Sequence, residues 1–443
     1  MNPQSKASAI LAVSLTFFAA LSLSAQTAKP SPGESSAVQK EELKFVVIVS
    51  RHGVRSPTGK ADLLNRYSRQ LWPAWSVLPG YLTEHGAQLM TLMGAYDHEW
   101  LASKGLLVPS GCADAQHIRI IADSDQRTRE TGKALAAGLT PGCKLEVTAL
   151  PEGTEDPLFH SLAAGAGKPD RALAMQAVSG RIGGNPLGLT EAYRPQFEAL
   201  EEVLLACSPG AECKKEVPES LFTIPASLSP GKSDHLVELR SPLGLASTMT
   251  ENLLLEYTEG MDAKNVGWGR VDLGRLRGLL QLHTASEDIS QRTAYIARAQ
   301  SSNLLSHVLR SMEQAVAGHP VAGSLIKLDD RVLILVGHDT NLANIGGALG
   351  LSWLIDGRRD DTPPGGALVF ELWKQAGADE YAVRTFFIAQ TLDQMRNKTP
   401  LSLSVPPERV PVFVPGCGRP DGACDWIGFQ KALNDAVDPS FLK

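Results

Sequence analysis

The sequence FVVIVSRHGVRSPT, residues 45–58, joins an apolar run to a polar segment that begins where the run ends. The run from Phe45 to Val49 is rich in β-branched residues, which is typical of a strand buried on both faces of a parallel sheet. Gly53 and Pro57 lie in the loop that ends this strand. Because ligands of open α/β sheets bind beyond the carboxyl ends of the strands, we predict a ligand site at Arg51 to Thr58.

Strand and helix patterns alternate on both sides of a long middle segment. Apolar residues at helical spacing follow Thr83, and residues 118–122 resemble a strand that leads into a helix ending near Gly138. From 157 to 285 strand patterns are sparse. The alternation then resumes with a helix at 294–316, strands at 332–336, 367–372 and 383–389, and a helix from about Asn341. We therefore predict an α/β fold with a mostly parallel sheet flanked by helices, built from both chain ends, with an inserted smaller helical domain.

The predicted divisions of the chain begin with an export signal. Lys6 precedes an apolar run from Ala7 to Leu23, small residues follow it, and no second run approaches the roughly 20 residues of a membrane span. A Pro/Ser-rich segment comes next. We predict a signal peptide at 1–25, a tether at 26–43, an α/β catalytic domain at 44–156 and 286–443, and a helical cap domain at 157–285.

Cysteine usage agrees with export. All six cysteines follow the predicted signal peptide, and each has one near neighbour along the chain. A zinc site is the alternative, but the sequence has no CxxC pair and no His at ligand spacing from a Cys. We therefore expect three disulfides in an oxidising compartment, namely Cys112 with Cys143, Cys207 with Cys213, and Cys417 with Cys424.

Composition and charge exclude several classes of protein. With 443 residues, of which 43% are hydrophobic and 20% charged, the chain is globular and not disordered. The net charge of −6 gives no general attraction for nucleic acid or anionic lipid, so an anion site must be local.

Three polar segments carry candidate chemistry. In the first, His52 stands between Arg51 and Arg55, whose guanidinium groups suit phosphate oxygens, while Gly53 would let the backbone approach a ligand. The others are Gly337 to Asn341 (GHDTN) and Asp123 to Thr128 (DSDQRT). Structural explanations compete here: surface charges for the arginines, a hydrogen-bonded turn for the histidine, and helix caps for Asp339 and Asp125 or Ser124.

The motifs RHGVRSP and GHDTN together resemble the histidine acid phosphatase family, over nearly the whole mature chain. The segments IIADSDQRTRETGKALAAGL, DDTPPGGALVFELW and QTLDQMRNKTPLSL are similar to those of bacterial periplasmic phytases within it. The HDTN form favours a phytase over the glucose-1-phosphatase branch, which tends to carry HDSN.

The resemblance implies a role for each residue. His52 would be the nucleophile that forms a phosphohistidine, and Asp339 the general acid for the leaving alkoxide. Thr58 and Glu251 would line the substrate cleft. The phosphoryl oxygens would be bound by Arg51, Arg55, Arg127 and His338.

We therefore expect an exported phosphomonoesterase, a phytase acting on inositol hexakisphosphate, in the periplasm or secreted. The alternatives are a broad acid phosphatase or glucose-1-phosphatase-like enzyme and, from another class, a non-catalytic binder of phosphorylated ligands. We expect no cofactor and no metal, a phosphorylated small molecule as partner, no nucleic acid, no membrane after signal cleavage, and a monomer. Gly231-Lys232-Ser233 resembles part of a P-loop, but Ala226 replaces its first glycine and we predict no strand before it.

Overall fold

The computed structural model describes residues 41–59, 61–207, 210, 212–377 and 379–443. The predicted signal peptide and residues 26–40 of the predicted tether lie outside this part. Residues 41–43, which we assigned to the tether, are instead the start of strand β1 (Glu41–Arg51), where Glu41 pairs with Gln375. Because this end of the strand is only partly buried, it lacks the apolar run that marks residues 45–49.

Strands from both ends of the chain form one central sheet. Its order in the described residues is β11-β10-β9-β1-β6-β2-β3, with β12 paired to β10. The pairs β1·β6, β6·β2 and β2·β3 are parallel, and β9 to β12 extend the sheet by antiparallel pairs. This confirms the predicted α/β class with a sheet built from both chain ends; among the described strands of this sheet, three pairs are parallel and four are antiparallel. The other strands of the sheet are β2 (Ile118–Ala122), β3 (Val147–Thr148), β6 (Val332–Gly337), β9 (Ala367–Gln375), β10 (Tyr381–Ala389), β11 (Glu408–Pro411) and β12 (Ala423–Asp425).

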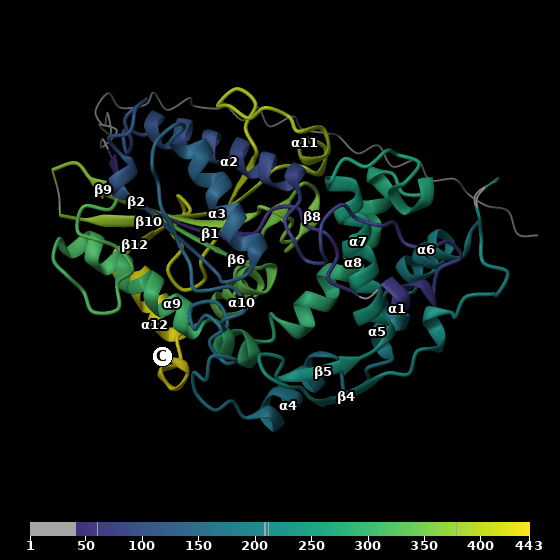
Figure 1. Ribbon diagram of the computed structural model, residues 1–443. Helices are drawn as coiled ribbons and strands as arrows, with labels where there is room; N and C mark the ends of the chain where they lie inside the picture. Colours follow the sequence, from purple (N-terminus) through teal and green to yellow (C-terminus); the bar gives the residue numbers. More distant parts are fainter. Residues whose placement is uncertain (1–40, 60, 208–209, 211, 378) are drawn as a thin grey trace, which may run out of the picture. The chain divides into compact units, whose positions relative to one another are not determined.

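Strand β1 is apolar from Phe45 to Val49 because both faces of this stretch are covered. Phe45, Val47 and Val49 pack in one hydrophobic cluster with α9 (Ala294–Ala317), α10 (Asp339–Leu349) and α12 (Trp426–Ala436). Val46 and Ile48 pack in another with α2 (Glu84–Ser103) and α3 (Gln126–Leu139). The two sets of helices lie on opposite faces of the sheet (Figure 1). Successive side chains of a strand point to opposite faces, so each face receives alternate residues.

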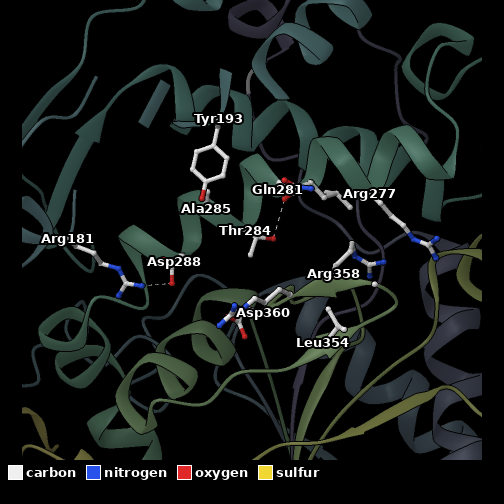
Figure 2. A pocket seen from close by; sticks show the side chains of 13 residues that line it. Arg181, Tyr193, Arg277, Gln281, Thr284, Ala285, Asp288, Leu354, Arg358 and Asp360 are labelled. Carbon is white, nitrogen blue, oxygen red and sulfur yellow. Dashed lines mark hydrogen bonds and ion pairs between the residues drawn. The ribbon is translucent and has the colours of Figure 1, made fainter. Parts of the chain in front are cut away.

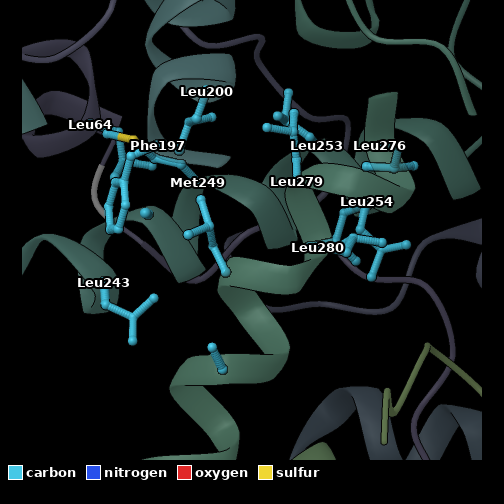
Figure 3. Packing of buried hydrophobic residues seen from close by; sticks show 14 of the residues in the cluster. Leu64, Phe197, Leu200, Leu243, Met249, Leu253, Leu254, Leu276, Leu279 and Leu280 are labelled. Atoms are coloured by element: carbon cyan, nitrogen blue, oxygen red, sulfur yellow. The ribbon is translucent and has the colours of Figure 1, made fainter. Parts of the chain in front are cut away.

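The helical part lies at one end of the strands (Figure 1). Its apolar side chains form a separate cluster, in which Phe197, Leu200 and Met249 are fully buried (Figure 3). The helices of this part are α4 (Arg171–Arg181), α5 (Gly188–Ala192), α6 (Arg194–Leu205), α7 (Pro242–Thr258) and α8 (Leu273–Ser290).

Two features of the helical part differ from the sequence analysis. Helix α8 continues through the predicted domain boundary at 285 and 286. A hairpin of β4 (Ser227–Pro230) and β5 (Val237–Arg240), which we did not predict, lies before α7. Gly231 to Ser233 belong to the turn of this hairpin; they follow a strand after all, but a second strand follows them where a P-loop needs a helix.

The described chain from residue 41 onward is a single compact unit, so the division into two domains stays a prediction. None of the helices in the described residues is long and apolar enough to cross a membrane. The remaining short elements are α1 (Ala61–Asn65), α11 (Leu392–Asn397), β7 (Leu354–Ile355) and β8 (Arg358–Arg359).

The six cysteines form the three predicted disulfides, Cys112–Cys143, Cys207–Cys213 and Cys417–Cys424. No free cysteine remains among them. The pairing fits an exported protein, because such bonds persist in oxidising compartments.

Candidate active site

The predicted residues converge at the carboxyl ends of three parallel strands. In the register of the sheet Arg51 lies beside Gly337, and Ala122 lies beside Val336, so these strands end level with one another. The His52 N–H donates to Gly337 O (3.0 Å), and the Asp123 N–H donates to Val336 O (2.9 Å). As a result His52, His338 and Asp123 leave the sheet as neighbours.

The ring of His52 is oriented by its own loop. Its Nδ1 lies 2.8 Å from Gly53 O, an arrangement in which Nδ1 carries the proton and the lone pair is on Nε2. Burial, followed by the positive charges of Arg51 and Arg55, holds the pKa of His52 well below its ordinary value. The ring is therefore neutral and has a nucleophilic nitrogen even in acid.

Gly53 is needed for helix packing. A Cβ at this position would lie 2.8 Å from Met90 Cγ and 3.1 Å from Gly86 O, both on α2. The approach of α2 to this loop is thus one reason for a glycine here, and the expectation that Gly53 lets the backbone approach a ligand stays a prediction.

Arg51 and Arg55 share one carboxylate. Both Nη2 atoms donate to Glu251 Oε1 on α7, at 2.5 Å and 3.0 Å. Arg51, which is fully buried, also donates to Thr362 O at 2.6 Å. Helix α7 thus links the helical part to the predicted phosphate-binding groups, and both guanidinium groups are oriented before any ligand binds.

Asp339 is the first residue of α10, and His338, not Asp339, is the helix N-cap. Asp339 Oδ2 lies 2.9 Å from Arg51 Nη2, and Oδ1 accepts the Thr340 N–H at 2.8 Å. Burial alone would raise the pKa of Asp339, but the charges of Arg51 and Arg55 outweigh it and lower the pKa below its ordinary value. In the ligand-free site Asp339 is therefore ionised.

His338 and Arg127 contact each other close to His52. His338 Nε2 lies 2.6 Å from Asp123 Oδ2, and its Nδ1 lies 3.3 Å from Arg127 Nη2. Its ring centre is 5.6 Å from that of His52. Asp125 is the N-cap of α3 but makes no capping hydrogen bond with its side chain, which instead pairs with Arg127 at 2.6 Å.

Thr58 lies at the edge of the cluster. A Cβ at Gly80, which has a φ of +79°, would lie 3.1 Å from Thr58 Cγ2 and 3.7 Å from Arg127 Nη1. Both side chains therefore border the same turn. The structure thus brings together all eight residues that we predicted for catalysis and binding.

Two residues of the cluster were missing from the predicted set. Asp123 had a usable signal, because it directly follows strand β2 beside the other strand ends. His160 had none. It lies in a loop and contacts Asp123 with its Nε2 at 3.1 Å.

Two groups in the described residues have ligand atoms within 4.8 Å of one another and could hold a metal ion: Asp123, His160 and His338, and Glu155, His160 and Asp234. In the first group the carboxylate and His338 are already hydrogen bonded. The expectation that the reaction needs no metal is not tested by these distances.

A large cavity lies away from the cluster. It has a volume of about 620 Å³ and is bordered by α8 and the β7–β8 hairpin, with Arg181, Arg277 and Arg358 around it (Figure 2). These arginines are paired with Asp288, Asp356 and Asp361. The cavity contains none of the predicted site residues.

The α/β sheet, the histidine between two arginines at one strand end and the His-Asp pair at the next define a phosphatase of the histidine type. Residues 42–180 and 249–388 match the Histidine phosphatase superfamily (branch 2). The chain belongs to this family.

Relatives over most of the chain include phytases and glucose-1-phosphatases. Phytase AppA of Escherichia coli (strain K12) is 38% identical over 421 residues, which are 93% of this chain and 96% of that protein. Glucose-1-phosphatase of Providencia rettgeri is 28% identical over 89% of this chain and 92% of that protein.

Solved structures of phytases superpose closely. The phytase from Citrobacter braakii is 36% identical with a TM-score of 0.83, over 91% of this chain and 100% of that chain. Hafnia alvei phytase in complex with myo-inositol hexakis sulphate is 34% identical with a TM-score of 0.80, over 91% of this chain and 99% of that chain.

Proposed function

We propose that this protein is an exported phytase that hydrolyses inositol hexakisphosphate through a phosphohistidine on His52. The observation that carries the proposal is the arrangement around the lone pair of His52 Nε2, with Arg51, Arg55 and Arg127 close by and Asp339 2.9 Å from Arg51. The relation to phytases and a solved complex with an inositol hexasulfate support the substrate class.

In the first step, His52 Nε2 attacks phosphorus as the bond from phosphorus to the ester oxygen breaks. The proton of Asp339 goes to that oxygen, so the alcohol leaves neutral. The three arginines bind the equatorial oxygens, whose charge they offset, and His338 donates its Nδ1–H to them once the charge of the bound phosphoryl group has raised its pKa. In the second step water attacks phosphorus, the bond to Nε2 breaks, and the Asp339 carboxylate takes the proton from the water.

The negative charge of the substrate lets Asp339 hold the proton that it needs, which comes from the solvent. In the ligand-free site the arginines lower the pKa of Asp339. A bound phosphoryl group offsets their charge, so the pKa of Asp339 rises when substrate binds. Even so, an acid with an ordinary pKa near 3.9 is protonated mainly below neutral pH, and we expect the highest activity in acid.

A rapid quench into alkaline denaturant tests the proposal. Enzyme mixed with ³²P-labelled phytate and quenched within milliseconds should carry label on His52, stable to base and labile to acid as phosphohistidine is. A non-catalytic binder of phosphorylated ligands would carry none, and that result would reject the proposal.

A glucose-1-phosphatase-like activity is the second candidate, favoured by the relation to the enzyme of Providencia rettgeri. Initial rates on phytate, glucose 1-phosphate and p-nitrophenyl phosphate separate the two. We expect kcat/KM to be highest on phytate. We also propose a periplasmic or secreted monomer; cell fractionation and light scattering test location and oligomeric state.

A further inference from the structure

His160 is bound by a carboxylate at each ring nitrogen. Its Nε2 lies 3.1 Å from Asp123 Oδ2, and its Nδ1 lies 3.0 Å from Asp234 Oδ2. A neutral imidazole has a single N–H, so both contacts are hydrogen bonds only when both nitrogens are protonated. His160 is therefore a cation between two anions. In agreement, the pKa of His160 rises to about 10, since the hydrogen bonds to Asp123 and Asp234 outweigh the effect of burial.

Asp234 is anchored at the tip of the β4–β5 hairpin. Its Oδ1 accepts the Ala163 N–H at 2.5 Å, and its backbone oxygen accepts from Gln300 Nε2 at 2.8 Å. Arg171 donates to the backbone oxygens of the residues on either side, Ser233 and His235, at 3.0 Å and 2.8 Å. The hairpin tip thus fixes the Asp234 carboxylate against the loop that carries His160.

On its other side, His160 acts on the predicted phosphate-binding histidine. Asp123 Oδ2 accepts from His160 and from His338, and the two rings are 5.1 Å apart. The backbone is tied as well, because Asn341 Nδ2 on α10 donates to Phe159 O at 2.9 Å. A continuous chain of contacts therefore runs from Asp234 through His160 and Asp123 to His338.

We propose that His160 and Asp234 are positioning residues of the phosphatase site, which fix Asp123 and through it the ring of His338. The proposal rests on the function proposed above. His160 has two effects on the site: its hydrogen bond restricts the Asp123 carboxylate to one orientation, and its charge opposes a second positive charge on His338.

The charge effect has a definite sign. Burial lowers the pKa of His338, the hydrogen bond to Asp123 raises it, and the charges of Arg127 and His160 lower it. A neutral residue at 160 should let His338 keep its second proton to higher pH. The other charged or titratable groups around His338 are Asp125 on the β2–α3 segment, His52 at the end of β1, and Asp339 on α10. Asp156 acts on Asp123 and His160.

The test uses His160→Ala, Asp234→Ala, their double variant, and His160→Gln, which keeps an N–H donor but no charge. We expect each alanine variant to lower kcat about 10-fold with little change in KM, since the chain orients a group that acts in the transition state. The double variant should lose no more than His160→Ala alone. His160→Gln should recover part of kcat and remain active to higher pH than the wild type.

The matched control is Asp329→Ala, which removes a His–Asp pair elsewhere, between His117 Nδ1 and Asp329 Oδ2 at 3.3 Å. It should leave kcat and the pH profile unchanged. Wild-type kcat and pH profile in His160→Ala would overturn the proposal. So would multiplicative losses in the double variant, because Asp234 would then not act through His160. If an alanine variant fails to fold, Asp234→Asn is measured instead. Its side chain keeps one acceptor, so kcat should fall by less than in the alanine variants.

A readout without turnover separates this proposal from the proposed function. The ring signals of His338, followed by NMR as pH changes, should titrate at higher pH in His160→Gln than in the wild type. If the wild type hydrolyses no phosphate ester, the proposed function fails while this titration still tests the coupling. An unchanged His338 titration in His160→Gln would overturn the charge effect.

Discussion

At the scale of single residues, His52 combines a fixed tautomer with a depressed pKa. Both come from its place at the end of β1, where Gly53 O lies beside Nδ1 and the arginines flank the ring. We expect His52→Ala to abolish phosphate release, because no other group in the cluster is a neutral nitrogen that faces the three arginines. Its melting temperature should stay close to that of the wild type.

The measurements are initial rates on p-nitrophenyl phosphate and thermal unfolding. His117→Ala, which removes a histidine distant from the site, serves as control and should keep full activity. Substantial turnover by folded His52→Ala would mean that another group attacks phosphorus.

Asp339 provides a second prediction at this scale. Asn keeps the shape of the side chain but carries no proton to give, so Asp339→Asn should lower turnover of phytate, an alkoxide leaving group, by about 10²- to 10⁴-fold. Turnover of p-nitrophenyl phosphate should fall less, because its phenoxide leaves with little help from an acid. Phosphate release from both substrates is compared at acid pH; equal losses would mean that Asp339 only orients Arg51.

At the scale of elements, helix α2 carries a carboxyl into the core. Asp97 lies among Ile48, Met93 and Leu135 under the sheet, and burial raises its pKa to about 7. The unfolded chain releases this proton near its ordinary pKa, whereas the folded protein keeps it to about pH 7. Folding is therefore most favoured below the ordinary pKa of Asp97. Between that value and about pH 7, the free energy of unfolding falls by about 1.4 kcal/mol for each pH unit.

Asp97→Asn should remove this loss. The free energy of unfolding in urea, measured at pH 4.5 and at pH 7, should differ less between the two pH values for Asp97→Asn than for the wild type. Glu256 and Glu287 have pKa values raised to about 8 and about 7, so part of the pH dependence of stability should remain in Asp97→Asn. Asp329→Asn, an exposed control, should match the wild type; an unchanged pH dependence in Asp97→Asn would show that Asp97 is ionised in the core.

The predictability of each element depended on its burial. Residues 45–49 and 332–336 are buried on both faces, so their apolar runs identified the strands. The β4–β5 hairpin is only partly buried, and its sequence contains Ser, Pro and Gly, so no pattern marked it. The predicted boundary at 285 and 286 fell inside α8. The residues at 286–288 are polar, so no apolar pattern indicated that the helix continues to Ser290.

At the scale of the whole molecule, the site is assembled from segments far apart in the chain. The motif at 51–58 and the pair at 338 and 339 could be recognised because each is local. The contact of Arg51 with Glu251 spans 200 residues and that of His160 with Asp234 spans 74, and local patterns carry no information about such contacts. Glu251 was found through family resemblance, and the partners of His160 only through the fold.

Each of the three disulfides lies within one part of the molecule. Cys112 and Cys143 follow α2 and α3 and both belong to the α/β part, whereas Cys207 and Cys213 both follow α6 in the helical part. No disulfide among the six cysteines connects the two parts, so contacts such as those of Glu251 on α7 with Arg51 and Arg55 must keep them together. Removing a disulfide should therefore lower stability without separating the parts, and unfolding should remain one transition.

The size of each loss should follow the length of the closed loop. The sequence separations are 31 for Cys112–Cys143 and 6 for Cys207–Cys213, and the longer loop restricts the unfolded chain more. The loop-closure relation makes the difference about 1.5 kcal/mol. Double alanine variants of each pair, unfolded in urea, measure it: Cys112→Ala/Cys143→Ala should be the less stable by that amount. A greater loss for the short loop would show that contacts of the folded α6 end, and not the entropy of the unfolded chain, determine what this disulfide contributes.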